Sequence, residues 1–507
     1  MKNWQLAGSA AFTTLLIGMG AAQAQVTPEE VWANWQQMSA SYGQAIISTS
    51  ATRDGDTLRI EGAAISMDDG AGGKVDAQLG KINFRDLGDG TVEVTMADSY
   101  PITMTVVPSG TDEKPANLAI LVTQPGLKMI VAGSPTKTSY AVSAPSVNVK
   151  VDEAPGAEAS AVDMLADITM TDVTANYLVE GEAETKTIDS TFAASSMALA
   201  ITAKEAAKPF EMIVNANIAD LTGNTKGTFL GVAAMANMAE ALKGGMNAEG
   251  GFSYGKTTFD INVTEEKGPT KITGAAESGS INFGIDKSRL AYGVGGKGMV
   301  LTVSGPEIPF PEVKVSYAEA AFNLLMPVSK SDVPEDFALS TRLVDFAISD
   351  DIWAMFDPTG TLPHDPATLI IDTKGTAKLT VNIVDEAATA ALGDAPPGEL
   401  HSLDLTELKA SVAGAELTGA GALTFDNSDL TTFAGMPLPT GKIDLKLVGA
   451  NSLLDKLIAM GLVPEDQAMG FRMMMPLFTV VGEGEDTLTS TLEFKDKGFF
   501  ANGQRLQ

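Results

Sequence analysis

Hydrophobic and polar residues alternate with a period of two along most of the chain, and the segment from Ser402 to Val448 shows the pattern clearly. Ile443, Leu445 and Leu447 are each separated by one polar residue. Successive side chains of a strand point to opposite faces of a sheet, so this alternation predicts strands with one apolar and one polar face. The same pattern recurs between residues 46 and 151 and through much of the second half, between turns of Gly, Asp and Pro.

A few segments have the three-to-four-residue hydrophobic spacing of helices instead. The first is predicted over residues 27–43, where Thr27 and Glu30 can form a capping box and Pro28 suits the first helical turn. Further helices are predicted over residues 229–242, near 344–356 and near 452–478.

These elements predict a mainly β fold, a β-rich α+β protein with elongated, twisted antiparallel sheets in two lobes and a few covering helices. A chain of 507 residues is long enough for two or more hydrophobic cores. We expect a boundary near residue 250, where Gly244-Gly245 follows a predicted helix. The N-terminal lobe then covers residues 25–250 and the C-terminal lobe covers residues 251–507.

The first 24 residues have the features of a secretory signal peptide. Lys2 supplies a positive charge, an apolar run extends from Leu6 to Met19, and Ala22-Gln23-Ala24 fits the small-residue cleavage pattern. The apolar run is shorter than the about 20 residues that a membrane-spanning helix needs. We therefore expect cleavage after Ala24 and a periplasmic location, with no transmembrane helix in the mature chain.

Composition narrows the possible chemistry. The chain has no cysteine, which excludes disulfides, thiolate metal ligands and cysteine nucleophiles. Its 64 acidic and 34 basic residues give a net charge of −30. That charge repels the phosphates of nucleic acids, so DNA and RNA are not expected as partners.

Two sequence strings match catalytic or cofactor motifs but lack the structural context that the chemistry requires. Gly251-Phe252-Ser253-Tyr254-Gly255 has the spacing of a serine nucleophile elbow. A helix precedes it and a strand follows, the reverse of the order that an elbow needs, so we interpret it as a tight turn. Gly293 to Gly298 has the spacing of a dinucleotide loop, but the predicted strand behind it offers no helix N-terminus to a phosphate. We interpret this string as a hairpin loop.

The two histidines, His364 and His401, lie next to turns and have no metal-ligand spacing. We therefore assign no catalytic, cofactor-binding or metal-binding residue. The sequence predicts a non-enzymatic protein without a cofactor.

Five residues are candidate contacts for an apolar ligand or partner: Trp32, Trp35, Met473, Met474 and Met475. Large aromatic side chains and flexible methionines suit lipids and adaptable peptides. Packing in the core is the competing interpretation for both groups, because such stripes at helical spacing more often face the interior.

Six short motifs occur along the chain: Val26–Trp32, Trp353–Pro358, Leu362–Ala367, Gly419–Leu423, Leu453–Leu457 and Asn502–Leu506. They resemble those of an uncharacterised, exported alphaproteobacterial family of DUF2125-like proteins. The resemblance extends over nearly the whole mature chain. The C-terminal pattern is also loosely similar to AsmA-like proteins, and that similarity implies an association with lipid traffic and outer-membrane assembly.

The long alternating segments and the scarcity of helices predict a sheet whose apolar face is incompletely covered. We therefore expect a periplasmic protein that binds a lipid or another apolar ligand in envelope homeostasis. The alternative is an envelope scaffold that binds another envelope protein through its sheet edges or its acidic face. An outer-membrane barrel, which the aromatic content of 6% disfavours, and a hydrolase rank lower.

Overall fold

The computed structural model describes residues 25–41, 44–68, 73–106, 116–153, 162–181, 185–205 and 208–507. The predicted signal peptide, residues 1–24, lies outside these ranges with its cleavage point, as do residues 42–43 at the end of the first predicted helix. Strands dominate the described residues and pair in the antiparallel sense, so the prediction of a mainly β fold is confirmed.

The chain divides into two compact units. Unit 1 contains the described residues up to Ser278 together with Gly305–Glu307, and unit 2 contains Gly279–Ser304 with Ile308–Gln507. The division therefore falls at residue 278 and not near 250. The glycines that follow the predicted helix do not end a domain, because the strands on either side of them pair with each other.

Unit 1 contains an antiparallel sheet in which most strands pair with their neighbours in the sequence. Four long strands each pair along one edge with two shorter strands: β3 with β1 and β2, β4 with β5 and β6, β9 with β7 and β8, and β12 with β13 and β14. The strands are β1 (Ala45–Ile47), β2 (Ser50–Asp54), β3 (Thr57–Asp68), β4 (Lys74–Asp86), β5 (Val92–Met96), β6 (Ser99–Val106), β7 (Ala116–Thr123), β8 (Lys128–Ser134), β9 (Lys137–Glu153), β10 (Val162–Glu180), β11 (Lys186–Glu205), β12 (Phe210–Phe229), β13 (Asn247–Tyr254), β14 (Thr257–Glu265) and β15 (Gly268–Ala276).

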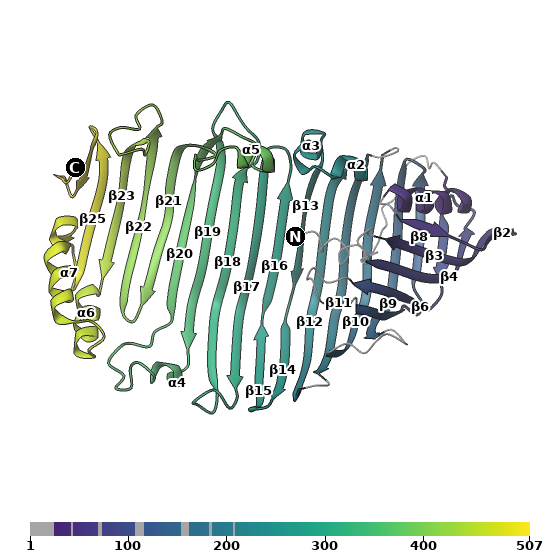
Figure 1. Cartoon of the computed structure of the whole chain (residues 1–507), viewed down its shortest axis with the longest axis horizontal. Coiled ribbons are helices and arrows are strands. Elements are labelled where there is room, and N and C mark those ends of the chain that lie inside the picture. Colours follow the sequence, from purple (N-terminus) through teal and green to yellow (C-terminus); the bar gives the residue numbers. More distant parts are fainter. Residues whose placement is uncertain are drawn as a thin grey trace. The chain divides into compact units, whose positions relative to one another are not determined.

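The core of unit 1 combines α1 (Pro28–Ser41) with one face of β3, β4, β5, β8 and β9. Phe84 is 0% exposed, and its ring lies 5.9 Å from that of Trp32 and 5.3 Å from that of Trp35 between centroids. Val94, on β5, is also fully buried. Helix α1 therefore covers the apolar side of these strands (Figure 1).

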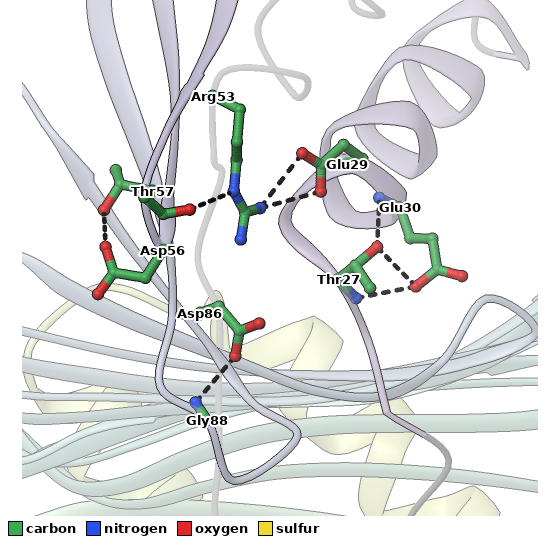
Figure 2. Close-up of polar contacts among 9 residues, drawn as sticks. Thr27, Glu29, Glu30, Arg53, Asp56, Thr57, Asp86 and Gly88 are labelled. Atoms are coloured by element: carbon green, nitrogen blue, oxygen red, sulfur yellow. Dashed lines mark hydrogen bonds and ion pairs between the residues drawn. The ribbon is translucent and has the colours of Figure 1, made fainter.

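The capping box predicted at the start of α1 is present (Figure 2). The Glu30 carboxylate accepts a hydrogen bond from the backbone N–H of Thr27 at 2.8 Å, and the Thr27 hydroxyl accepts one from the Glu30 N–H at 3.3 Å. Arg53 contacts the Glu29 carboxylate at 3.1 Å and donates to the Gly55 carbonyl at 2.9 Å. The first turn of α1 is thereby tied to the turn between β2 and β3.

Unit 2 is an antiparallel meander. Each strand from β17 to β22 pairs with the strand that follows it, and β23 pairs with β25. Figure 1 shows these strands side by side in chain order. The strands are β16, which begins at the last residue of unit 1 (Ser278–Ile285), β17 (Arg289–Ser304), β18 (Val313–Pro327), β19 (Glu335–Ile348), β20 (Ala367–Leu379), β21 (Gly398–Val412), β22 (Ala415–Asp426), β23 (Leu438–Val448), β24 (Val480–Val481), β25 (Thr487–Lys495), β26 (Gly498–Ala501) and β27 (Gln504–Arg505).

The helix predicted near residues 344–356 is wrong over most of its length. Residues 344–348 end β19, and only α4 (Asp350–Trp353) is helical. A β-bulge explains the error. Asp345 adopts a left-handed φ of 52° and adds one residue to its strand, which disturbs the alternation that identifies strands in a sequence.

The helix predicted over residues 229–242 is divided into α2 (Val232–Met235) and α3 (Met238–Lys243). Asn237 separates them, because its side chain accepts a hydrogen bond from the Glu240 N–H and so caps a new helix. Another short helix, α5 (Glu386–Ala390), follows β20.

Two helices occupy the segment near 452–478, namely α6 (Ala450–Ala459) and α7 (Glu465–Phe478). Leu453 and Leu457 of α6 pack with Trp353 of α4 in a small cluster. Helix α6 contacts β22 and α7, and the last residue of α7, Phe478, accepts a hydrogen bond from Ser490 of β25 (Figure 1). Among the described residues, no helix combines the length and the apolar character needed to cross a bilayer.

Candidate functional site

One face of the unit 2 sheet is apolar from β17 to β25, and we call it the apolar face. The strand register aligns its side chains in rows that cross the sheet, because each residue lies opposite a residue on the same face of the next strand. The rows are Tyr292, Leu324, Leu339, Thr373, Leu405, Gly421, Ile443 and Leu492; Val294, Phe322, Thr341, Ile371, Leu408, Gly419, Leu445 and Ser490; and Ala320, Leu343, Leu369, Ala410, Leu417, Leu447 and Leu488.

The hydrophobic side chains of the apolar face are only partly shielded from water. Leu339 is 38% exposed and Leu369 is 40% exposed, whereas Phe84 in the core of unit 1 is fully buried. The remaining leucines and isoleucines of the three rows are half-buried. Such a broad exposed apolar surface is uncommon on soluble proteins and marks a binding surface in many of them.

The opposite face of the same strands carries charged side chains in pairs. The Arg342 guanidinium binds the carboxylates of Asp372 and Glu407, the latter at 2.9 Å, and hydrogen bonding to Asp372 raises the pKa of Arg342. Lys409 contacts Glu416 at 3.0 Å. The sheet therefore separates charged and apolar residues onto its two sides.

Hollows of different size lie on this sheet. A hollow of about 230 Å³ on the apolar face is lined by Leu343, Leu369, Ala410 and Val412 among others. A wider hollow of about 620 Å³ is lined by polar residues of the opposite face, including Lys446, and by Leu408, Gly419, Leu445 and Ser490 of the second row. The apolar hollow lies where the third row meets the ends of β20 and β21.

Unit 1 also carries an apolar row, which crosses β9 to β15. Its members face one another in register and are half-buried. They are Val151, Ala166, Ile201, Val214, Ile261 and Ile272. The side chains of this row are therefore only partly shielded from water, in contrast to the strands of unit 1 that α1 covers.

Helix α7 presents hydrophobic side chains to solvent. Met473 is 70% exposed, Met469 and Met474 are also exposed, and Met475 is half-buried. Ala468 is the buried residue of the helix. Two of the three methionines expected to contact an apolar ligand or partner, Met473 and Met474, therefore lie on an accessible surface and not in the core.

The two tryptophans of the predicted site lie elsewhere. Trp32 is 7% exposed and packs with Trp35 against Phe84 in the core of unit 1. Trp35 is partly buried and forms a hydrogen bond with Tyr140. The expectation that Trp32 contacts a ligand is therefore corrected, because its surface is already occupied by the core.

His364 packs against α4 of unit 2 and lies close to two carboxylates. Its ring stacks on that of Trp353 at 4.4 Å, and its Nδ1 lies 3.2 Å from the Asp350 carboxylate. The Nε2 atom lies 3.6 Å from the Asp357 carboxylate. Burial opposes ionisation of Asp357, but hydrogen bonds from the N–H groups of Leu362 and Thr361 outweigh it and lower the pKa of the carboxyl group.

This cluster has a structural role that the geometry explains. Asp357 accepts hydrogen bonds from its own loop, and His364 fills the gap between that loop and α4. Among the described residues, no group of three His, Asp or Glu side chains has the arrangement of a metal site.

The two motif-like strings both fall within strands. Ser253 lies in β13, and its hydroxyl is 2.7 Å from that of Thr222 on β12. The string from Gly293 to Gly298 lies within β17 and pairs with β18, so the hairpin-loop interpretation is wrong. A side chain at Gly293 would lie 2.7 Å from Oδ1 of Asn323, so close contact with a neighbouring strand accounts for this glycine.

Comparison with known proteins finds a family match over part of the chain and no activity. Residues 294–503 match a family described as an uncharacterized protein conserved in bacteria, DUF2125. No curated protein and no solved structure matches the chain. The predicted resemblance is thus confirmed over residues 294–503, and Val26–Trp32 lies outside the match. The similarity to AsmA-like proteins stays a prediction. The match contains most of the apolar face and all of α7.

Proposed function

Because residues 294–503 match the uncharacterized bacterial family DUF2125, we propose a function from the geometry of that region. The protein binds the acyl chain of a lipid on the apolar face of unit 2, as an exported component of the cell envelope. The observation that supports the proposal is the partial exposure of three apolar rows that cross the sheet.

The dimensions of the apolar face suit a hydrocarbon chain. Two of its rows cross eight strands, from β17 to β23 and then β25. At about 4.8 Å between strands, the rows extend over about 33 Å. An acyl chain spans about half of the roughly 30 Å hydrocarbon core of a bilayer, so one chain fits along a row.

The chemistry of the rows selects for an apolar ligand. They contain no charged side chain, and their polar members are the hydroxyl residues Tyr292, Thr341, Thr373 and Ser490. Each methylene group removed from water contributes about 0.8 kcal/mol, so partial burial of one acyl chain is sufficient for binding. At Gly419 and Gly421, Leu445 and Ile443 of β23 occupy the space that a larger side chain would need.

Two measurements test the proposal. Native mass spectrometry of protein purified from a bacterial periplasm is expected to show a bound lipid that organic extraction recovers. A fluorescent fatty acid is expected to bind the delipidated protein. The variant Leu339→Asp places a carboxylate in the first row, and we expect its affinity for the fatty acid to fall by about tenfold or more.

Leu430→Asp is the matched control, because Leu430 is 48% exposed in the loop between β22 and β23 and not on the apolar face. It is expected to bind like the wild type. Equal binding by both variants, or a purified protein without lipid that does not bind the fatty acid, would contradict the proposal. Circular dichroism in the far ultraviolet verifies that both variants retain the sheet.

A further inference from the structure

Helix α7 exposes to solvent the hydrophobic side chains that a helix on a protein surface usually buries. Met469, Met473 and Leu477 recur at intervals of four residues and so share one side of the helix. All three are exposed, and so are Met474 and Phe471, which extend the exposed arc to about 200° around the helix. A surface helix normally turns such residues toward the core. We call this set of five residues the α7 surface.

The α7 surface is continuous with the edge of the apolar face. Thr479 ends α7, and the next residues form β24, in which Val481 pairs with Leu488 of β25. Val481 therefore extends the third row of the apolar face by one strand, and it is 85% exposed. The link is rigid, because the Ser490 hydroxyl donates a hydrogen bond of 2.6 Å to the Phe478 carbonyl.

The charges around α7 restrict what can cover it. The single cation of the helix, Arg472, is paired with Asp455 of α6, and the first turn carries Glu465 and Asp466. No cation of α7 is therefore free to bind anionic lipids, and the net charge of −30 opposes them. The same charge opposes a second copy of the chain, which would bring two acidic surfaces together.

The side chains of the α7 surface also lack hydrogen-bonding groups. Ordinary protein interfaces carry about one hydrogen bond per 100–200 Å². A surface of methionine, leucine and phenylalanine offers only apolar atoms, and methionine adapts to irregular, fluid surroundings. These properties favour lipid over a folded protein partner.

From these observations we infer that α7 docks unit 2 onto the headgroup–acyl boundary of a zwitterionic phospholipid bilayer. The helix lies in the plane of the interface with the α7 surface in the acyl region. Docking places the edge of the apolar face, at Val481, next to the bilayer. A role of this docking in lipid exchange rests on the proposed function, whereas the docking of α7 itself does not.

Vesicle flotation tests the inference with the purified protein, whose N-terminus is verified by intact mass. The wild type is expected to float with vesicles of pure phosphatidylcholine and to float less with vesicles that contain phosphatidylglycerol. Met473→Ser combined with Met474→Ser is expected to reduce partitioning by about tenfold for each side chain. Met473→Leu with Met474→Leu keeps the apolar surface and is expected to restore partitioning.

Met355→Ser is the matched control, because Met355 is 65% exposed near α4 and lies outside the α7 surface. It is expected to float like the wild type. Equal flotation of the serine double variant and the wild type would overturn the inference. So would a wild type that does not float but forms a dimer that the double variant dissociates, as measured by light scattering.

The variant Leu339→Asp separates this inference from the proposed function. It changes the apolar face and leaves α7 unchanged, so it is expected to float normally while losing affinity for the fatty acid. Normal flotation together with normal fatty-acid binding by this variant would contradict the acyl-binding proposal alone. Loss of flotation by Leu339→Asp would contradict α7 as the docking element.

Discussion

A matched pair of substitutions, Phe84→Ala and Phe322→Ala, tests whether the apolar face is as open as the structure indicates. Phe84 is fully buried and packs against Trp32 and Trp35, whereas Phe322 lies on the apolar face and is 36% exposed. The two substitutions remove the same atoms. The loss in free energy of unfolding that each substitution causes therefore reports how deeply Phe84 and Phe322 are buried.

The expected magnitudes follow from that difference. Phe84→Ala leaves a cavity and is expected to lower the free energy of unfolding of unit 1 by about 3–5 kcal/mol, including two aromatic contacts. For a unit of this size, the melting temperature falls by about 2–4 °C for each kcal/mol. Phe322→Ala forms no closed cavity, so its expected cost to unit 2 is about 1–2 kcal/mol.

Tryptophan fluorescence during urea unfolding can measure each unit separately. In a Trp4→Phe, Trp353→Phe background, Trp32 and Trp35 are the remaining reporters, and both lie in unit 1. Trp353 reports on unit 2 when the other tryptophans are replaced. Equal costs for the two substitutions, within about 1 kcal/mol, would refute the reasoning, because Phe322 would then be buried by a layer that the structure lacks.

Three further predictions concern stability. Burial raises the pKa of Tyr140 to about 12, although a hydrogen bond with Trp35 opposes the shift. The unfolded chain releases the Tyr140 proton near pH 10, so the free energy of unfolding is expected to fall between about pH 10 and 12. Tyr140→Phe is expected to reduce that fall, which urea titrations at a series of pH values measure. Gly441→Ala is expected to destabilise unit 2 by about 1–3 kcal/mol in thermal unfolding, because Gly441 has a φ of +136° and a Cβ there would lie 2.1 Å from the Ala422 carbonyl oxygen. Thr27→Ala removes half of the capping box and is expected to cost about 1 kcal/mol, measured by urea unfolding of unit 1.

Each of these predictions has a control. For Gly441 it is Gly470→Ala in α7, where a Cβ would meet no atom within 4 Å and helix propensity predicts a gain of about 0.5–1 kcal/mol. For Thr27 it is Thr27→Ser, which keeps the hydroxyl and is expected to retain most of the stability. A fall in stability that is the same in Tyr140→Phe as in the wild type would show that other groups cause the alkaline loss.

The alternation of residues was sufficient to predict the class of fold because it is a local property. Ile443, Leu445 and Leu447 face one side of β23 as expected, and this pattern needs no knowledge of the neighbouring strands. The capping box at Thr27 is equally local. The bulge at Asp345 was not predictable, because the extra residue is defined only by the partner strand that it fails to match.

The candidate site was likewise only partly predictable from the sequence. The methionines of α7 stood out in the sequence, but whether they face solvent depends on how α6 and α7 pack, which spacing alone does not reveal. Trp32 and Trp35 had the same apolar character and proved to belong to the core, because Phe84 lies beneath them. The apolar face itself requires the register of eight strands, although every one of its leucines was visible in the sequence.

The meander of unit 2 has a consequence for the evolution of this region. From β17 to β22 each strand pairs with the next one in the chain, so a hairpin gained or lost at any turn leaves the remaining pairings intact. Every inserted hairpin widens the sheet by two strand spacings, or about 10 Å. The number of hairpins in a relative would then act as a molecular ruler for the length of hydrocarbon it accommodates.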